Sequence, residues 1–283
     1  MTLIDFIDFA INGICVILWL NWRAVGVAQP VVGSGISLLA TLKRAETRRV
    51  NRWISLVTLG SLLLLRAAFY WLIGFEFAWT LPIDLGPIAI PFRADFFGRV
   101  ALYSLLSFGL LLGVFYSSLL LLSILNRRTG ENDYLCRLMR LHLGRIDHLP
   151  AFIKLSLPVV GSMFLWVTCA PLLRMWGMVP PWLNFSHLCQ QSVVFGAMSI
   201  LTWLYILTAI LALYLLQSYV YLGNHYAWSF LNLTAKNLLR PLEKYPIQIG
   251  KFDLRPVVAI GVILGFWACV HWGAAEVYQR LPF

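Results

Sequence analysis

Charged residues are scarce in this sequence, and acidic residues are the scarcest of them. Only 12% of the 283 residues are charged, and Asp and Glu together number 12; soluble domains carry roughly 25% charged residues. The few carboxylates are dispersed along the chain, so no pair is placed for general acid–base catalysis. Nucleophile elbows and phosphate-binding loops are also absent. We therefore expect a protein without enzymatic activity and with no catalytic residue.

Cysteine and histidine are equally thinly spread. The five cysteines occur singly, without a CxxC pair, which favours small packing residues over a metal or redox site. A b-type haem would need two histidines that face each other, and only His187 and His271 lie at comparable positions near span ends. We expect no metal and no cofactor, and haem at this pair is the one alternative left open.

Long apolar runs are what the sequence has in abundance. Hydrophobic residues make up 60% of the chain, and its mean hydropathy is +0.78. A run of about 18 or more apolar residues is typical of a membrane span. Six runs are candidates: 4–20, 54–75, 99–125, 155–173, 191–222 and 256–275. We expect an all-α, polytopic integral membrane protein with about six transmembrane helices.

The basic residues are distributed unevenly between the loops. Of the 22 Lys and Arg residues, 17 lie in three alternate segments, with six after the first predicted span, six after the third and five after the fifth. Because basic loops are retained on the cytoplasmic side, this pattern predicts both termini outside the inner membrane of a bacterium. The net charge of +10 therefore reflects topology and an anionic lipid leaflet, and we expect no nucleic-acid partner.

Two basic segments align with each other and indicate an internal repeat. Residues 145–150 match 240–246, and residues 154–160 match 251–258, each with one extra residue in the second copy. We expect a first repeat over 98–178 and a second over 190–275. Residues 1–97 would form a separate two-span module with a basic inner loop and an outer hairpin-like loop near 80–92.

An amphipathic helix parallel to the membrane is expected within each repeat. In the second copy, the apolar face is predicted to hold Trp228, Leu231, Ala235, Leu238, Leu239 and Leu242. In the first copy, it is predicted to hold Leu135, Leu138, His142, Ile146 and Leu149. Proline ends each segment, at Pro150 or Pro246, and Pro158 and Pro256 are expected near the first turn of the following span.

The second copy also contains a proline-rich turn followed by Asp and Pro at the start of a span. The residues concerned are Arg240, Pro241, Pro246, Gly250, Asp253, Leu254 and Pro256, and the first copy keeps only Arg145, Pro150, Ser156 and Pro158. This pattern resembles the signature of the YggT family of small membrane proteins, over about residues 100–275. It departs from that signature at Arg255, where the family usually has Ser, and at Glu243 and Lys244, where basic residues are usual.

The resemblance implies a duplicated pair of spans and no enzymatic activity. It favours a scaffold, an assembly factor or an accessory subunit of a membrane complex, with other membrane subunits or further copies of the chain as partners beside the lipids. The alternative is a small channel or transporter with a pathway between the two repeats, since parallel repeats occur in transporters.

Arg66 is the most conspicuous single residue, because it lies inside the second apolar run. A charged residue there is costly and is by default paired or functional. Asp8 in the first run lies at a comparable depth, so we predict an intramembrane Arg66–Asp8 pair. The alternatives are that Arg66 extends to the outer interface, or that it contacts a lipid or partner subunit. A second ion pair, Arg240–Asp253, is expected to bridge the proline-rich turn.

Overall fold

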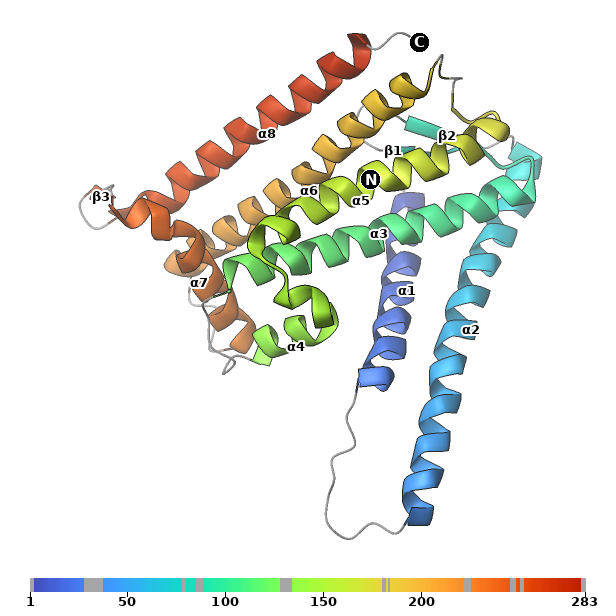
Figure 1. Cartoon of the computed structure of the whole chain (residues 1–283), viewed down its shortest axis with the longest axis horizontal. Coiled ribbons are helices and arrows are strands. Elements are labelled where there is room, and N and C mark those ends of the chain that lie inside the picture. The colour runs from blue at the N-terminus through green and yellow to red at the C-terminus, as the bar shows by residue number, and fades with distance from the viewer. Residues whose placement is uncertain are drawn as a thin grey trace. The chain divides into compact units, whose positions relative to one another are not determined.

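The protein is almost entirely helical in a computed structural model (Figure 1). The structure describes residues 3–27, 38–77, 80–84, 89–127, 134–179, 182, 184–220, 225–244, 248–249 and 252–280. Six of its helices are long and apolar enough to cross a membrane. They are α1 (Leu3–Val27), α2 (Leu38–Phe77), α3 (Phe97–Leu125), α5 (Ala151–Met175), α6 (Phe185–Tyr219) and α8 (Arg255–Arg280). The predicted all-α class and the six apolar helices are confirmed.

Shorter elements connect the long helices. Strands β1 (Thr80–Asp84) and β2 (Ala89–Arg93) pair with each other at the position of the predicted hairpin. Two short helices, α4 (Tyr134–Leu143) and α7 (Tyr226–Leu239), are each followed by a 3-10 turn, η1 (Gly144–His148) and η2 (Arg240–Lys244). Strands β3 (Gln248–Ile249) and β4 (Phe252–Asp253) are antiparallel and precede α8. The order long helix, short helix, 3-10 turn, long helix thus occurs twice.

The chain divides into two compact units. The first comprises Met1–Ile83 and Pro91–Gly113, and the second comprises Asp84–Ile90 and Val114–Phe283. This division differs from the boundary expected at residue 97, because α3 contributes to both units. Its first half packs with α1 and α2, where Phe108 joins Cys15, Leu59 and Leu63 in one apolar cluster.

Within the first unit, α1 and α2 pack along each other. The C-terminal end of α2 approaches the backbone after β2 very closely at Gly74. A Cβ atom at that position would lie 2.0 Å from the Cβ of Ala94, so only glycine permits this contact. Phe92 of β2 is fully buried, and its ring contacts Tyr103 of α3 edge-on with the centroids 5.6 Å apart.

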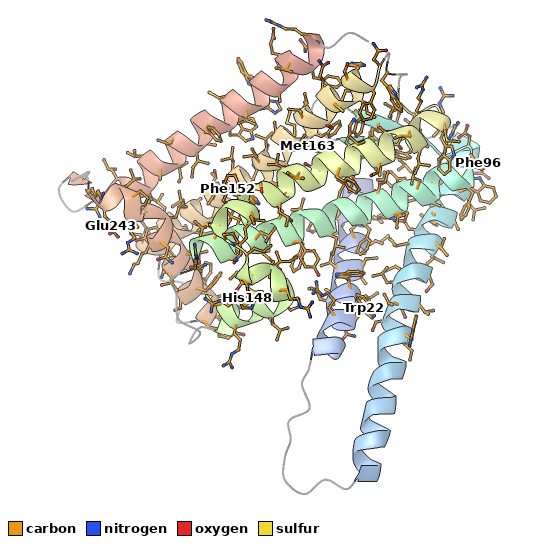
Figure 2. All side chains as sticks on the ribbon, in the orientation of Figure 1. Trp22, Phe96, His148, Phe152, Met163 and Glu243 are labelled. Atoms are coloured by element: carbon orange, nitrogen blue, oxygen red, sulfur yellow. The ribbon has the colours of Figure 1, made fainter. Side chains whose placement is uncertain are left out.

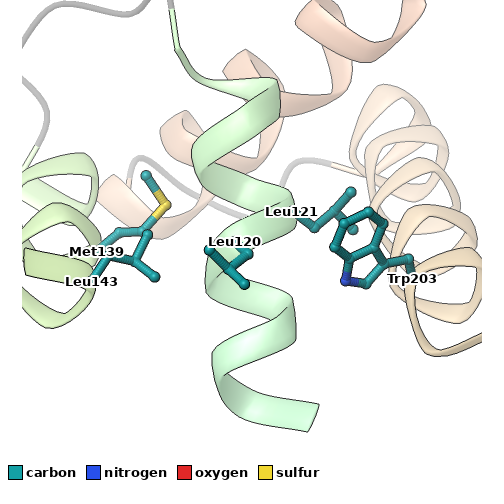
Figure 3. Packing of buried hydrophobic residues seen from close by; sticks show 5 residues of the cluster. All are labelled: Leu120, Leu121, Met139, Leu143 and Trp203. Carbon is teal, nitrogen blue, oxygen red and sulfur yellow. The ribbon is translucent and has the colours of Figure 1, made fainter. Parts of the chain in front are cut away.

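Within the second unit, α6 packs against both α5 and α8. Gly196 allows α5 and α6 to approach, because a Cβ there would lie 2.8 Å from Cγ of Met163, which is labelled in Figure 2. A second cluster forms around the end of α3: Leu120 faces Met139 and Leu143 of α4, and Leu121 faces Trp203 of α6 (Figure 3).

The helical face that α4 buries differs from the predicted one. The buried residues are Cys136, Met139 and Leu143, whereas Leu138 and Ile146 are exposed. The prediction for α7 agrees better with the structure, since Ala235 and Leu239 are buried, and Thr234 is buried beside them. The buried residues of α4 keep helical spacing, and contact with Leu120 of α3 turns the helix away from the predicted orientation.

Proline has the expected position in the second copy but not in the first. Pro256 is the second residue of α8, where a missing N–H costs little. By contrast, α5 begins at Ala151 after Pro150, so Pro158 lies inside the helix and not in its first turn. Lys154, which precedes Pro158 by one turn, is buried, and its contacts explain why the helix begins early.

Candidate functional site

The Arg66 side chain is buried in the first unit and makes hydrogen bonds with all three of its nitrogen atoms. The residue is only 2% exposed. Its Nε donates to Oγ of Ser104 at 2.9 Å, and its Nη2 donates to the backbone carbonyl of the same residue at 2.5 Å. Its Nη1 donates to Oδ1 of Asn12 at 2.8 Å and, at 3.5 Å, to Oδ1 of Asp8. The guanidinium is therefore held mainly by neutral groups.

The Asp8 carboxylate is held by two tyrosine hydroxyls. The Tyr70 hydroxyl donates to Oδ1 at 2.7 Å, and the Tyr103 hydroxyl donates to Oδ2 at 2.5 Å. The Tyr103 ring also lies near the guanidinium of Arg66, with its centroid 5.8 Å from Cζ, within the range of a cation–π contact. Both carboxylate oxygens thus have donors, and the charge is balanced by Arg66 within the same network.

Helical spacing brings these side chains together. The network uses polar residues four positions apart on three helices: Asp8 and Asn12 on α1, Arg66 and Tyr70 on α2, and Tyr103 and Ser107 on α3. Residues four apart lie on one helical face, so each helix presents a polar pair to the other two. The structure places the predicted partners Arg66 and Asp8 together. It also adds neutral residues whose i, i+4 spacing was the only signal in the sequence.

A second buried charge cluster lies in the second unit and was not predicted. Lys154 of α5 is 4% exposed. Its Nζ donates to Oγ of Ser123 at 2.6 Å and lies 2.9 Å from Oδ1 of Asp147 in η1. Ser123 also donates to Asp147 Oδ1, and Arg140 lies 3.7 Å from the other carboxylate oxygen. This cluster fixes the turn between α4 and α5 against the end of α3.

The surroundings of Asp147 change its titration. Burial alone would raise the pKa of this carboxyl, but hydrogen bonds from Ser123 and Lys154, with the charges of Lys154 and Arg140, outweigh burial. The pKa therefore lies below the ordinary aspartate value. Asp147 is an ionised anchor near neutral pH and is poorly suited to act as a general base.

A neutral hydrogen-bond chain ties the end of α3 to α7. Asn126 is 1% exposed; its Nδ2 donates to Oγ1 of Thr234 at 2.9 Å. Asn237 donates from Nδ2 to Asn126 Oδ1 at 3.0 Å. Asn126 of the first repeat is thus linked to Thr234 and Asn237 of the second repeat, more than 100 positions away.

The remaining predicted site residues are not brought together in the described part of the chain. Arg240 and Pro241 are exposed in η2, and Pro256 is buried at the start of α8. Arg145 is exposed within η1, and Pro150 is exposed directly before α5. Pro246 and Gly250 lie outside the described residues, as does the side chain of Asp253 in β4. The expected Arg240–Asp253 pair therefore stays a prediction.

Several polar atoms of the second unit are buried without a hydrogen-bond partner among the described residues. They are Nε1 of Trp166 on α5, Oε1 of Gln191 and of Gln217 on α6, and Nε1 of Trp267 on α8. The Trp166 ring stacks on Phe195 at 3.9 Å, and the Trp267 ring stacks on His271 at 5.0 Å. His187, the other histidine of the haem alternative, is buried on α6. Within the described ranges, no three His, Cys, Asp or Glu side chains could hold a metal ion.

Comparison of the chain with protein-family models, with curated proteins and with solved structures finds no match. The chemistry of the described clusters is therefore the basis on which a function is assigned. In both charge clusters the donors and acceptors are directed at one another, an arrangement that fixes helices in place.

Proposed function

We propose that the protein is an integral component of a bacterial inner membrane and acts as a non-enzymatic scaffold, assembly factor or accessory subunit of a membrane complex. In this proposal the six apolar helices cross the membrane, both termini lie outside, and the three basic segments lie in the cytoplasm. Support comes from the 17 basic residues in alternate loops, because such a bias sets orientation.

The observation that carries the proposal is the contrast between matched buried charges and an apolar exterior. Arg66 and Asp8 have their partners within the chain, so their role is to join helices. The outward faces of the long helices, in contrast, expose large apolar side chains such as Phe152, Phe164 and Trp272, the first of which is labelled in Figure 2. Lipid tails or neighbouring subunits are the natural cover for such faces.

The YggT-like character of the chain is part of the proposal. It is supported by the residues from Arg240 to Pro256 and by the repeated order of a long helix, a short helix, a 3-10 turn and a long helix. In each half, the short helix packs apolar residues against the long helices, with Met139 and Leu143 in α4 and Leu239 in α7. The two copies of this order offer two similar surfaces at which partner subunits or further copies of the chain can pack.

The test is purification of the full-length protein from native membranes in a mild detergent, with mass spectrometry and an absorption spectrum of the intact particle. Stoichiometric partner subunits or a defined homo-oligomer support the proposal. The orientation is tested separately by fusing a reporter enzyme that is active only in the periplasm to the C-terminus, and activity of the reporter is expected. A monomer that carries no partner would contradict it. A second tagged membrane protein, purified in parallel, identifies non-specific binders.

A channel or transporter is the second candidate, and the buried polar atoms of α5, α6 and α8 favour it. Trp166, Gln191 and Trp267 each bury a donor or acceptor with no partner among the described residues, and such groups are satisfied by water or solute in a transport pathway. Solute flux into liposomes by the purified protein alone would establish this function. Gln191→Leu is expected to abolish the flux, and Gln190→Leu, at the more exposed neighbouring position, is the matched control.

A further inference from the structure

The outer face of α4 and η1 combines exposed leucine with exposed arginine. Leu138 is 41% exposed and Leu141 is 40% exposed. Arg137 is exposed on the same side of α4, because positions 137, 138 and 141 lie within roughly one third of a turn at about 100° per residue. Arg145 is exposed in η1, directly after α4. We refer to these four residues as the α4 face.

The opposite side of α4 is fully used in packing, so the α4 face is fixed outward. Met139 and Leu143 contact Leu120 of α3 (Figure 3), and Cys136 is fully buried. Turning the exposed side of α4 inward would expose these three residues and bury Arg137. The burial of a cation without a partner is far more costly than its exposure.

The charge of the α4 face is not cancelled by its own segment. Asp147 is the acidic residue of the stretch from Tyr134 to Leu149, and its carboxylate faces Lys154, Ser123 and Arg140. Within the described ranges, no carboxylate lies within ion-pair distance of Arg137 or Arg145. Two positive charges therefore remain available beside two leucines.

We propose that the α4 face binds anionic phospholipid headgroups at the cytoplasmic surface of the membrane. Leucines at this spacing enter the boundary between headgroups and acyl chains, while arginine side chains extend to the phosphates. Guanidinium binds phosphate through two parallel hydrogen bonds. An anionic headgroup is favoured over a zwitterionic one because no choline cation offsets its phosphate charge beside Arg137 and Arg145. The inference rests on the proposed membrane insertion, and it adds a lipid class and a binding surface to it.

The test is a titration of the delipidated, full-length protein in detergent, followed by native mass spectrometry. Phosphatidylglycerol and phosphatidylcholine with identical acyl chains are the probes. Each basic residue near an anionic surface contributes roughly fivefold, so two arginines predict a preference of about 25-fold for phosphatidylglycerol. Wild-type protein without such a preference would overturn the proposal.

Three variants locate the binding surface. Arg137→Gln with Arg145→Gln is expected to reduce the preference to near unity, whereas Arg137→Lys with Arg145→Lys keeps most of it. Leu138→Ser with Leu141→Ser weakens binding of both lipids. The charge-matched control, Arg99→Gln with Arg280→Gln, removes two arginines that each pair with a carboxylate four residues away, and it is expected to keep the preference. Equal losses in the control and in the α4 variant would contradict the site.

Two further measurements separate the possible failures. Competition by soluble glycerol phosphate at comparable concentration, or a protein partner that displaces the lipid from this face, would overturn the assignment to phospholipid. Resistance of the protein to alkaline extraction from vesicles tests the membrane insertion independently. If the protein resists extraction and shows no lipid preference, only the α4 proposal fails; if it is extracted, the proposed function fails first. Thermal unfolding of each variant confirms that it folds.

Discussion

The two buried charge clusters compensate their buried cations, Arg66 and Lys154, with different kinds of partner. In the first unit, the Arg66 side chain is fully buried and lies 3.5 Å from Asp8, while each of them has shorter hydrogen bonds to neutral groups. In the second unit, Lys154 lies 2.9 Å from Asp147, whose carboxylate is 16% exposed and is shared with Arg140. The first cluster is a hydrogen-bond network that contains an ion pair, and the second is an ion pair near the helix boundary.

This difference follows from the position of each cluster along its helices. Arg66 lies in the middle of an apolar stretch, where solvent cannot compensate a charge, so hydroxyl, amide and carbonyl groups take that role. Lys154 is in the first turn of α5, where polar groups are ordinary and a partly exposed carboxylate is tolerated. The clusters should therefore differ in the cost of a single substitution.

The largest expected effect is that of Arg66→Leu. The substitution leaves the Asp8 carboxylate and the carbonyl of Ser104 buried without their cation, and we expect a loss of about 3 kcal/mol in the free energy of unfolding. The measurement is reversible unfolding in mixed detergent micelles. Arg280→Leu on α8 is the matched control, and its exposed ion pair with Glu276 is expected to contribute less than about 0.5 kcal/mol.

Asp8→Asn tests whether neutral hydrogen bonds dominate the first cluster. The amide keeps one oxygen that accepts a tyrosine hydroxyl, and Arg66 keeps Asn12 and Ser104. The loss should therefore be smaller than that of Arg66→Leu, at about 1–2 kcal/mol. If the two substitutions cost the same, the ion pair rather than the network holds the helices together.

The next effect is that of Lys154→Met in the second cluster. It removes the cation closest to Asp147, but Arg140 and partial exposure remain to compensate the carboxylate. We expect a loss of about 1–1.5 kcal/mol in the free energy of unfolding, since solvent reduces the cost of the remaining charge. Lys236→Met on the exposed side of α7 is the control. A loss as large as that of Arg66→Leu would remove the distinction between the clusters.

A residue of these clusters can be predicted from the sequence only when its charge differs from the residues around it. A lone arginine in an apolar run stands out, and Asp8 is the acid at matching depth, so that pairing could be proposed. Asn12, Tyr70 and Tyr103 are neutral and common in such helices, so nothing but their spacing marks them. The Lys154–Asp147 pair gave no signal, because charges near the end of a span are unremarkable.

The fold shows the same limits. Hydropathy predicts the six long helices, because run length and apolar content are properties of the segment itself. The orientation of α4 and the position of Pro158 inside α5 depend on contacts with α3, through Met139 and through Lys154. Those contacts join residues 19 to 31 positions apart, beyond the range of local periodicity. The division of α3 between two units has the same tertiary origin.

Acid should weaken the second cluster through protonation of Asp147. The pKa of Asp147 in the folded protein lies below its unfolded value, so its contribution to stability is complete above the unfolded pKa, near about 4, and is lost as the pH falls through the folded pKa. The loss is expected to be smaller than that of Lys154→Met, because a protonated carboxyl still hydrogen-bonds Ser123.

The measurement is the melting temperature of wild type and of Asp147→Asn from about pH 7 to about pH 3. The difference between them should be constant at the upper end and shrink at the lower end, because asparagine does not titrate. Asp95→Asn, which removes an exposed pair with Arg99, is the control and should show little change. A difference that grows as the pH falls would contradict the assigned direction.

The smallest effect on stability is expected at the hydrogen bonds between the end of α3 and α7, because these bonds join neutral side chains. A double-mutant cycle of Asn126→Ala and Thr234→Val isolates the hydrogen bond of 2.9 Å between them. Neutral hydrogen bonds between membrane helices average about 0.6 kcal/mol, so the coupling energy should be about that size and independent of pH. The bond from Asn237 to Asn126 is lost equally in both arms that contain Asn126→Ala and cancels. A coupling energy above about 2 kcal/mol would exceed the range of neutral hydrogen bonds between membrane helices and contradict this ranking.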